Sequence, residues 1–159
     1  MSGAVEIDRN TIEGFAWRVR KNLIFMLEAQ ARGEDLHIVT HLANSLLGLI
    51  VFPYEQFKRA RRIDFRSVKL ADLTATGWPG WSFQVGGSDD LDDLLRHLRN
   101  ALSHRRVRFS SDSRELAGVD ITFWDRRNPD GPDDWSTSIR GDELLDFALR
   151  LAGLIEDSK

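Results

Sequence analysis

A short segment near residue 100 carries the side chains that are best suited to do chemistry. Arg99, Asn100 and His104 place a permanent cation, an amide and a titratable imidazole within six residues. A basic run follows directly and consists of Arg105, Arg106 and Arg108. An arginine side chain can hold a phosphate, and a histidine can transfer a proton near neutral pH. Together these groups are sufficient for cleavage of a phosphodiester without a metal ion.

The element that must position this segment is a helix, which the sequence predicts from Ser88 or Asp89 to about His104. Its apolar side chains form one stripe that must face the core, made of Leu91, Leu95, Leu98 and Leu102. Asn100 and His104 are four residues apart and lie on the opposite face, which points away from the core. His104 is therefore not expected to be a core histidine, although a histidine simply exposed to solvent is the plainest alternative. A site on this face needs a cover, which a second copy of the chain across a two-fold axis can provide.

The other predicted elements place this helix within a mainly α-helical domain. Helices are predicted over residues 10–32, 36–52 and 141–156, with a short one over 54–62. Beyond residue 104 the hydrophobic period changes to two, which predicts a three-stranded antiparallel meander from residues 107–109, 119–123 and 135–139. Residues 63–87 have no pattern that assigns an architecture. The sequence thus predicts a single domain over residues 1–159, with a small β insertion at about 105–139 before the last helix.

The composition is that of an ordinary globular protein without covalent cross-links. The chain has 159 residues, of which 42% are hydrophobic and 30% are charged, and it contains no cysteine. Disulfides and thiolate metal sites are therefore excluded. The net charge of −3 argues against a protein that coats nucleic acid without selectivity. Neither a signal peptide nor a membrane span is predicted, so we expect a cytoplasmic protein with no membrane partner.

Two other groups of side chains have a chemical interpretation. His37 and His41 are four residues apart on a predicted helix, a spacing that can bind zinc. Neither an HExxH-like glutamate nor a cysteine accompanies them, so no metal site is predicted. A second basic cluster either extends a track for nucleic acid or forms a solvated helix surface, and it consists of Lys58, Arg59, Arg61, Arg62, Arg66 and Lys69.

The segment from Arg99 to His104 resembles the signature of the HEPN superfamily (higher eukaryotes and prokaryotes nucleotide-binding), in which an arginine and a polar residue precede a histidine. Residues 39–53 resemble the second helix of a bacterial subfamily borne on plasmids and chromosomes, and the order of the later elements is also similar. The resemblance implies a HEPN-like up-down helical bundle that dimerises through the motif helix. It also implies metal-independent endoribonuclease activity in many members, often as toxins or defence effectors, whereas other members keep only a binding or scaffolding role.

On this basis we expect specific roles for the residues near position 100. His104 would act as general base on the RNA 2′-hydroxyl or as general acid to the leaving 5′-oxygen. Arg99 would stabilise the charge on the phosphorane, and Asn100 would orient His104 or hydrogen-bond the phosphate. Flanking phosphates would be held by four arginines, which are Arg96, Arg105, Arg106 and Arg108. No metal ion and no cofactor is expected.

Three functions are compatible with the sequence alone. The first is a homodimeric ribonuclease that acts on RNA, with an antitoxin protein as a further partner if the enzyme is a toxin. The second is a non-catalytic HEPN module that binds RNA or a nucleotide. The third is a structural dimer in which Arg99 and the other motif residues serve only the interface.

Overall fold

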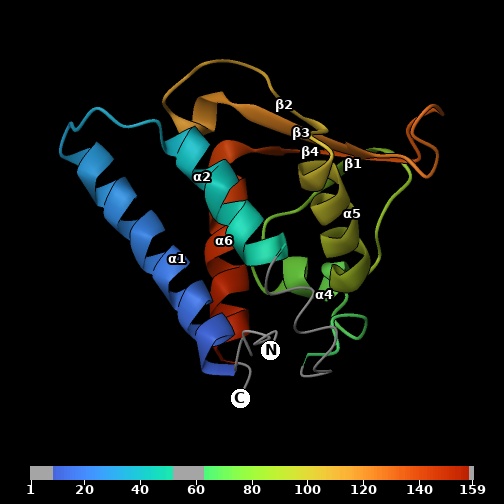
Figure 1. Ribbon diagram of the computed structural model, residues 1–159, viewed down its shortest axis with the longest axis horizontal. Coiled ribbons are helices and arrows are strands. Elements are labelled where there is room, and N and C mark those ends of the chain that lie inside the picture. The colour runs from blue at the N-terminus through green and yellow to red at the C-terminus, as the bar shows by residue number, and fades with distance from the viewer. Residues whose placement is uncertain (1–8, 52–62, 158–159) are drawn as a thin grey trace, which may run out of the picture.

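The structure is a computed structural model, which describes residues 9–51 and 63–157 (Figure 1). Its elements follow one another in the order α1 (Arg9–Ala31), α2 (Ile38–Leu46), the π-helix η1 (Leu47–Val51), α4 (Leu70–Ala75), β1 (Ser82–Val85), α5 (Leu91–Ser103), β2 (Val107–Phe109), the 3₁₀-helix η2 (Leu116–Gly118), β3 (Asp120–Asp125), β4 (Trp135–Arg140) and α6 (Gly141–Glu156). Helices dominate these residues, which confirms the mainly α-helical class. None of the helices described has the length and apolarity that a membrane crossing requires.

The predicted helices correspond closely to helices of the structure. The last one coincides with α6, and the helix predicted over residues 10–32 corresponds to α1 to within one residue at either end. The helix predicted over residues 36–52 is divided, because its second half continues from α2 as η1. The helix predicted over residues 54–62 lies outside the described residues. Helix α4 falls within the segment that the sequence leaves unassigned.

The sheet has four antiparallel strands in the order β1-β4-β3-β2. Strands β2, β3 and β4 form the predicted meander, in which Ile121 lies opposite Ile139 and Phe123 lies opposite Thr137. Strand β1 pairs with β4 and was not predicted, since it lies outside the expected β insertion. It contains only four residues, of which Phe83 alone is partly buried, so it is too short to produce a detectable period of two.

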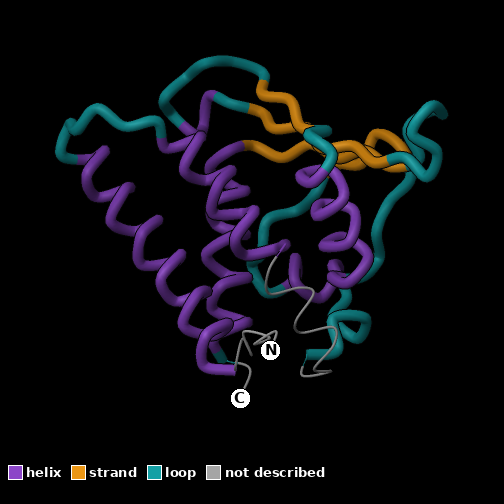
Figure 2. Tube along the Cα trace, viewed as in Figure 1, coloured by secondary structure: helices purple, strands orange, loops and turns teal. Residues whose placement is uncertain are grey.

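The helices lie on one face of this sheet, as Figures 1 and 2 show. Helices α1, α2 and α6 pack together beneath one end of the sheet, and α5 packs against β3 beneath the other end (Figure 1). One hydrophobic core cluster includes buried residues from all of these elements. The position of α5 is therefore set by apolar contacts with the sheet and with the other helices.

The alternation of side chains along β3 determines which of them face α5. Ile121, Phe123 and Asp125 are buried, whereas the residues between them are only partly buried. Ile121 and Phe123 belong to the same core cluster as Leu95 and Leu98 of α5. Asp125 continues this inward row at the end of the strand, so a carboxylate is placed inside the protein beside α5.

Candidate functional site

Helix α5, which carries the candidate residues, is capped by Asp90. The Oδ1 atom of Asp90 accepts a hydrogen bond of 2.9 Å from the backbone N–H of Asp93. The helix therefore begins at Leu91, two or three residues after the predicted start at Ser88 or Asp89. Ser88 instead donates its hydroxyl to the side chain of Asp93 at 2.6 Å, which leaves the capping role to Asp90.

The other end of α5 is a tight reversal with His104 at the C-cap. The N–H of Arg106 donates to the carbonyl of Ala101 at 2.8 Å, and the N–H of Arg105 donates to that of Leu102 at 3.2 Å, which together form a Schellman motif. Arg105 has a φ of 57°, a conformation in which glycine is normally found. The reversal leaves the side chain of His104 exposed and turns Arg106 back toward the sheet.

Asn100 does not lie on an open face of the helix, contrary to the expectation from helical spacing. The buried face of α5 extends to Leu94 and Ala101, and the end of β3 covers the adjoining surface. Asn100 is therefore half-buried, and its Nδ2 donates to Asp125 Oδ2 at 3.0 Å. A helical wheel treats one helix in isolation, whereas this partner lies 25 positions further along the chain.

The carboxylate of Asp125, which is only 5% exposed, is the centre of the polar contacts around α5. Its Oδ2 accepts from His97 Nδ1 at 2.8 Å as well as from Asn100. Its Oδ1 accepts from Arg106 Nη1 at 3.1 Å and from the backbone N–H of Arg126 at 2.9 Å. Burial by itself raises the pKa of Asp125, but the hydrogen bonds from Asn100, His97 and the backbone hold this pKa below its usual value. The group is thus an ionised acceptor with donors on both oxygens.

His97 is a titratable residue that the sequence-based prediction did not include. Its ring stacks on Trp135, with the ring centroids 4.7 Å apart and the planes inclined by 10°. Nδ1 donates to the Asp125 carboxylate, while Nε2 lies 3.1 Å from Arg96 Nη2 and 3.7 Å from Asp93 Oδ2. The contact with Asp125 therefore requires a proton on Nδ1.

Further hydrogen bonds support His97 from the side of β4. Trp135 Nε1 donates to Ser88 Oγ at 3.1 Å, and Ser88 donates in turn to Asp93. Asp93 also forms an ion pair with Arg96. Burial raises the pKa of Asp93, but the hydrogen bonds from Ser88 and Arg96 outweigh burial and lower it. The stacked ring of His97 is thus held between a buried carboxylate and an anchored arginine.

The sequence contains a pattern that could have assigned His97 to the candidate site, but it contains no such pattern for Asp125. His97 precedes Asn100 by three residues and His104 by seven, which places all three on one side of a helix. Asp125 is one of 25 acidic residues in the chain and lies 28 positions beyond His97. Only the packing of β3 against α5 brings this carboxylate to the candidate site.

Two of the predicted site residues, Asn100 and Arg106, contact Asp125, and a third, Arg96, contacts His97. The side chain of Arg106 is 14% exposed because its guanidinium is paired with Asp125. The side chain of Arg96 is 44% exposed, so it keeps a solvent-facing surface although it contacts both Asp93 and His97. These three residues form a polar layer between α5 and the end of the sheet.

The remaining predicted site residues lie at or beyond the end of α5, except for one on its flank. His104 and Arg105 are exposed in the reversal, and Arg108 is exposed on β2. Arg99 is half-buried on α5. The structure therefore leaves the side chains of His104 and the adjacent Arg105 exposed in the reversal, and a further arginine exposed on β2.

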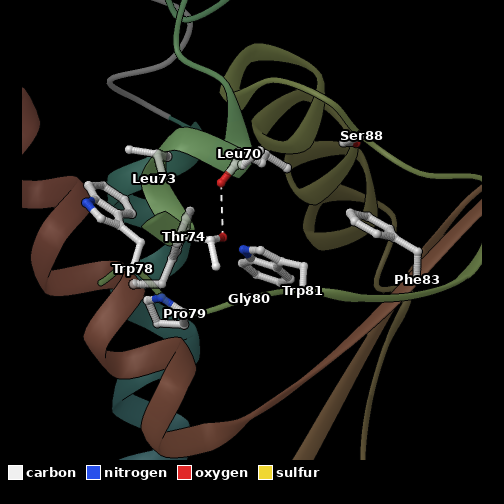
Figure 3. Close-up of a pocket in the computed structure, with 11 residues that line it drawn as sticks. Leu70, Leu73, Thr74, Trp78, Pro79, Gly80, Trp81, Phe83 and Ser88 are labelled. Carbon is white, nitrogen blue, oxygen red and sulfur yellow. Dashed lines mark hydrogen bonds between the residues drawn. The ribbon is translucent and has the colours of Figure 1, made fainter. Parts of the chain in front are cut away.

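An aromatic cavity of about 300 Å³ lies between α4, β1 and α6. Its lining includes Phe147 of α6 and three aromatic residues that Figure 3 labels, Trp78, Trp81 and Phe83. Figure 3 also marks the hydrogen bond that Thr74 Oγ1 donates to the Leu70 carbonyl, which is 3.0 Å long. None of the predicted site residues lines this cavity. The predicted site residues therefore lie outside this cavity.

His37 and His41 line different cavities. His37 lines a cavity of about 400 Å³ together with Phe109 and Arg114, whereas His41 lines another, of about 190 Å³, with Asn22 and other residues of α1. His37 stands at the N-cap of α2, and His41 lies within that helix. Within residues 9–51 and 63–157, no group of three or more metal-ligating side chains is close enough to hold an ion.

The second basic cluster is described only at Arg66 and Lys69. Arg66 pairs with Asp92 at 3.6 Å, and Lys69 pairs with Asp90 at 3.9 Å. Both acidic partners stand at the beginning of α5, at the opposite end of the helix from His104. The other four residues of the cluster lie outside the described part of the chain.

Comparison with known proteins identifies one match to a family model. The model is described as HEPN pEK499 p136, and it matches residues 6–159. No curated protein and no solved structure matches the chain.

Proposed function

Because this chain belongs to the HEPN family described as pEK499 p136, we propose that it is an endoribonuclease that cleaves RNA without a metal ion. HEPN domains are generally nucleases or nucleotide-binding domains, so the family is compatible with this activity. The observation that carries the proposal is the exposed imidazole of His104, which ends the helix that bears Arg99 and Asn100.

The proposed reaction uses the substrate's own 2′-hydroxyl as the nucleophile. His104 removes the proton of this hydroxyl, and the 2′-oxygen forms a bond to phosphorus. The bond from phosphorus to the 5′-oxygen breaks, and that oxygen receives a proton from a second imidazole. Arg99 stabilises the negative charge that builds on the non-bridging oxygens. The products are a 2′,3′-cyclic phosphate and a 5′-hydroxyl.

The proposal includes a homodimer in which two copies of α5 face each other. Each protomer supplies one motif histidine, but the reaction needs one group to accept a proton and another to donate one. A two-fold axis near the end of α5 would bring two copies of His104 to one phosphate. The exposure of His104 and of the neighbouring Arg105 supports this arrangement, because neither is covered within the described protomer.

Phosphates on either side of the scissile bond are assigned to the exposed arginines. Arg105 is exposed next to His104, Arg108 is exposed on β2, and Arg96 is exposed in part. Arg106 is paired with Asp125 and is assigned to holding the site rather than to binding RNA. Binding through these arginines is expected to weaken as salt concentration rises.

The test is cleavage of RNA by the purified protein in the presence of a metal chelator. We expect His104→Ala to bind RNA but to lose at least about 100-fold in cleavage rate, because acid–base assistance is worth about 10²–10⁴-fold. His41→Ala is the matched control, since His41 is also exposed but lies on α2, and it should cleave normally.

The same experiment separates the alternatives. An oligonucleotide with 2′-deoxyribose at the cleaved position should bind and stay intact, because it has no internal nucleophile. Binding of RNA or of a nucleotide by wild-type protein without any cleavage would identify the non-catalytic module instead. Normal cleavage by His104→Ala would exclude the mechanism.

The biological role that we propose is that of a toxin or defence effector held in check by an antitoxin protein. Expression of the wild-type chain in bacterial cells should then arrest growth, whereas expression of His104→Ala at the same level should not. Equal growth of cells that express the two proteins would contradict the toxin role without excluding ribonuclease activity.

A further inference from the structure

A polar unit at the junction of β3 and α5 connects Asp125, His97 and Asn100. We propose that Asp125 and His97 are positioning residues for the motif, and that they hold the side-chain amide of Asn100 in one orientation. The inference rests on the proposed ribonuclease function and adds to it two residues that the motif does not contain. Neither of them is proposed to touch the RNA.

Asp125 determines which way the amide of Asn100 turns. An ionised carboxylate only accepts hydrogen bonds, so Asn100 must direct its NH₂ group toward Asp125 and its amide oxygen elsewhere. That oxygen is then available as an acceptor on the side of the helix that continues to His104 one turn later. An imidazole N–H is a suitable donor for it. The proposal assigns this oxygen to orientation of the imidazole, whereas the second N–H of the amide can still donate to a phosphate.

His97 helps to hold the carboxylate that holds Asn100. Oδ2 of Asp125 is shared by His97 Nδ1 at 2.8 Å and Asn100 Nδ2 at 3.0 Å, while Oδ1 is held by Arg106 and a backbone N–H. With donors on both oxygens, the carboxylate cannot rotate unless several hydrogen bonds break. The ring of His97 is itself fixed by stacking on Trp135. Asn100 is therefore oriented by a rigid set of groups from two strands and one helix.

Packing alone does not explain these residue types. Position 125 is an inward position of β3, where an apolar side chain would avoid the cost of burying a charge. The chain has a carboxylate there instead, and two of its partners, Asn100 and Arg106, flank the exposed His104. A fully bonded polar network restricts the orientation of each member, which is the property that an aligned catalytic group requires.

Two substitutions of His97 separate positioning from packing. The amide nitrogen of an asparagine lies close to where Nδ1 of a histidine lies, so His97→Asn keeps a donor for Asp125. The amide nitrogen of a glutamine lies closer to Nε2, so His97→Gln loses this donor. We expect His97→Gln to lower kcat for RNA cleavage by up to about 100-fold with little change in KM, because a misaligned group can cost that much. His97→Asn should retain most of kcat, and equal losses in both variants, or a loss confined to KM, would overturn the inference.

A second measurement tests the unit without any substrate. NMR of the free wild-type protein should show the ring proton of His97 on Nδ1 and one side-chain amide proton of Asn100 protected from exchange. Asp125→Asn should release that amide proton. If the wild-type protein cleaves no RNA, the proposed function fails, and these signals still decide whether the positioning unit exists. A His97 ring protonated only on Nε2, or an unprotected Asn100 amide, would overturn the inference even if RNA is cleaved.

Discussion

Asp125 shows how one residue connects the sheet to the motif helix. Its side chain points inward because it follows Ile121 and Phe123 at the period of a β-strand. Its charge is tolerated there because four donors surround it, two of which come from α5. Removal of the carboxylate therefore affects its partners more than it affects the strand itself.

At this residue scale, we expect Asp125→Ala to lower the free energy of unfolding by about 3 kcal/mol, because it leaves the mostly buried guanidinium of Arg106 without its partner. Asp133→Ala is the control, since Asp133 forms a more exposed ion pair with Arg126, and it should cost less than about 1 kcal/mol. Urea denaturation of the two variants measures the difference. An equal decrease in the free energy of unfolding in both variants would show that the contacts of Asp125 stabilise the protein no more than a surface ion pair does.

Acid stability provides a second test of the same carboxylates. The pKa values of Asp125 and Asp93 in the folded protein lie below the usual value of 3.8, so protons bind more readily to the unfolded chain. Their contribution to stability is complete above the unfolded-state pKa and is lost as the pH falls through the lower folded-state pKa. We expect the free energy of unfolding to decline below about pH 4 in the wild type and to decline less in Asp125→Asn. A parallel decline in both proteins would contradict the lowered pKa of Asp125.

Helix α5 is an element whose two ends are built differently. Asp90 caps its beginning with a side-chain oxygen, and a Schellman motif closes its end. The closing position carries Arg105 in the left-handed conformation instead of glycine. Since this conformation is unfavourable for a side chain with a Cβ atom, stability at that position is lost while a positive charge is kept next to His104.

At the scale of this element, we expect Arg105→Gly to raise the free energy of unfolding by about 1 kcal/mol, because glycine relieves the left-handed strain. Arg108→Gly removes the same charge from β2, where glycine is unfavourable, and should lower stability by about 0.5–1 kcal/mol. Urea denaturation measures whether the free energy of unfolding rises or falls in each variant. If both arginines bind phosphate, the affinity for RNA should fall in both variants despite the opposite changes in stability. A variant with unchanged affinity would show that the arginine it lacks is not part of the proposed binding surface.

Within the described residues, two different surfaces are candidates for contact with a second copy. One is the end of α5 with His104, and the other is the outer face of α1, where Trp17, Ile24 and Phe25 are exposed although they are large and apolar. Phe25 is 60% exposed, which makes α1 the main rival to α5 as a dimer interface. The proposed composite site requires the surface at α5.

At the scale of the whole molecule, a single engineered cysteine distinguishes the two surfaces, because the chain contains no cysteine of its own. We expect a bifunctional thiol cross-linker to join two copies of His104→Cys and to leave Phe25→Cys unlinked. A direct disulfide needs Cα atoms within about 7 Å of each other, which is too close for two imidazoles with a phosphate between them. Electrophoresis without reductant measures both. Linkage through Phe25→Cys alone would place the interface on α1 and contradict a site shared between two copies of α5.

The amino-acid sequence by itself determined the features that depend on neighbours along the chain. Helical spacing of apolar residues predicted α5 and the bounds of α6, alternation predicted β2, β3 and β4, and the segment from Arg99 to His104 indicated the family. Each of these signals repeats within a few residues, so no knowledge of distant segments is needed.

Only the tertiary structure decided how the motif helix is covered. In the tertiary structure Asp125 contacts Asn100 and His97, and Arg106 pairs with the same buried carboxylate. Strand β1 also pairs with β4 at the edge of the sheet. These contacts join residues that are 19 to 28 positions apart, or further in the case of β1 and β4. The physical reason is that apolar burial fixes how β3 packs on α5, and the polar side chains at that junction then bond to whichever partners the packing brings within reach.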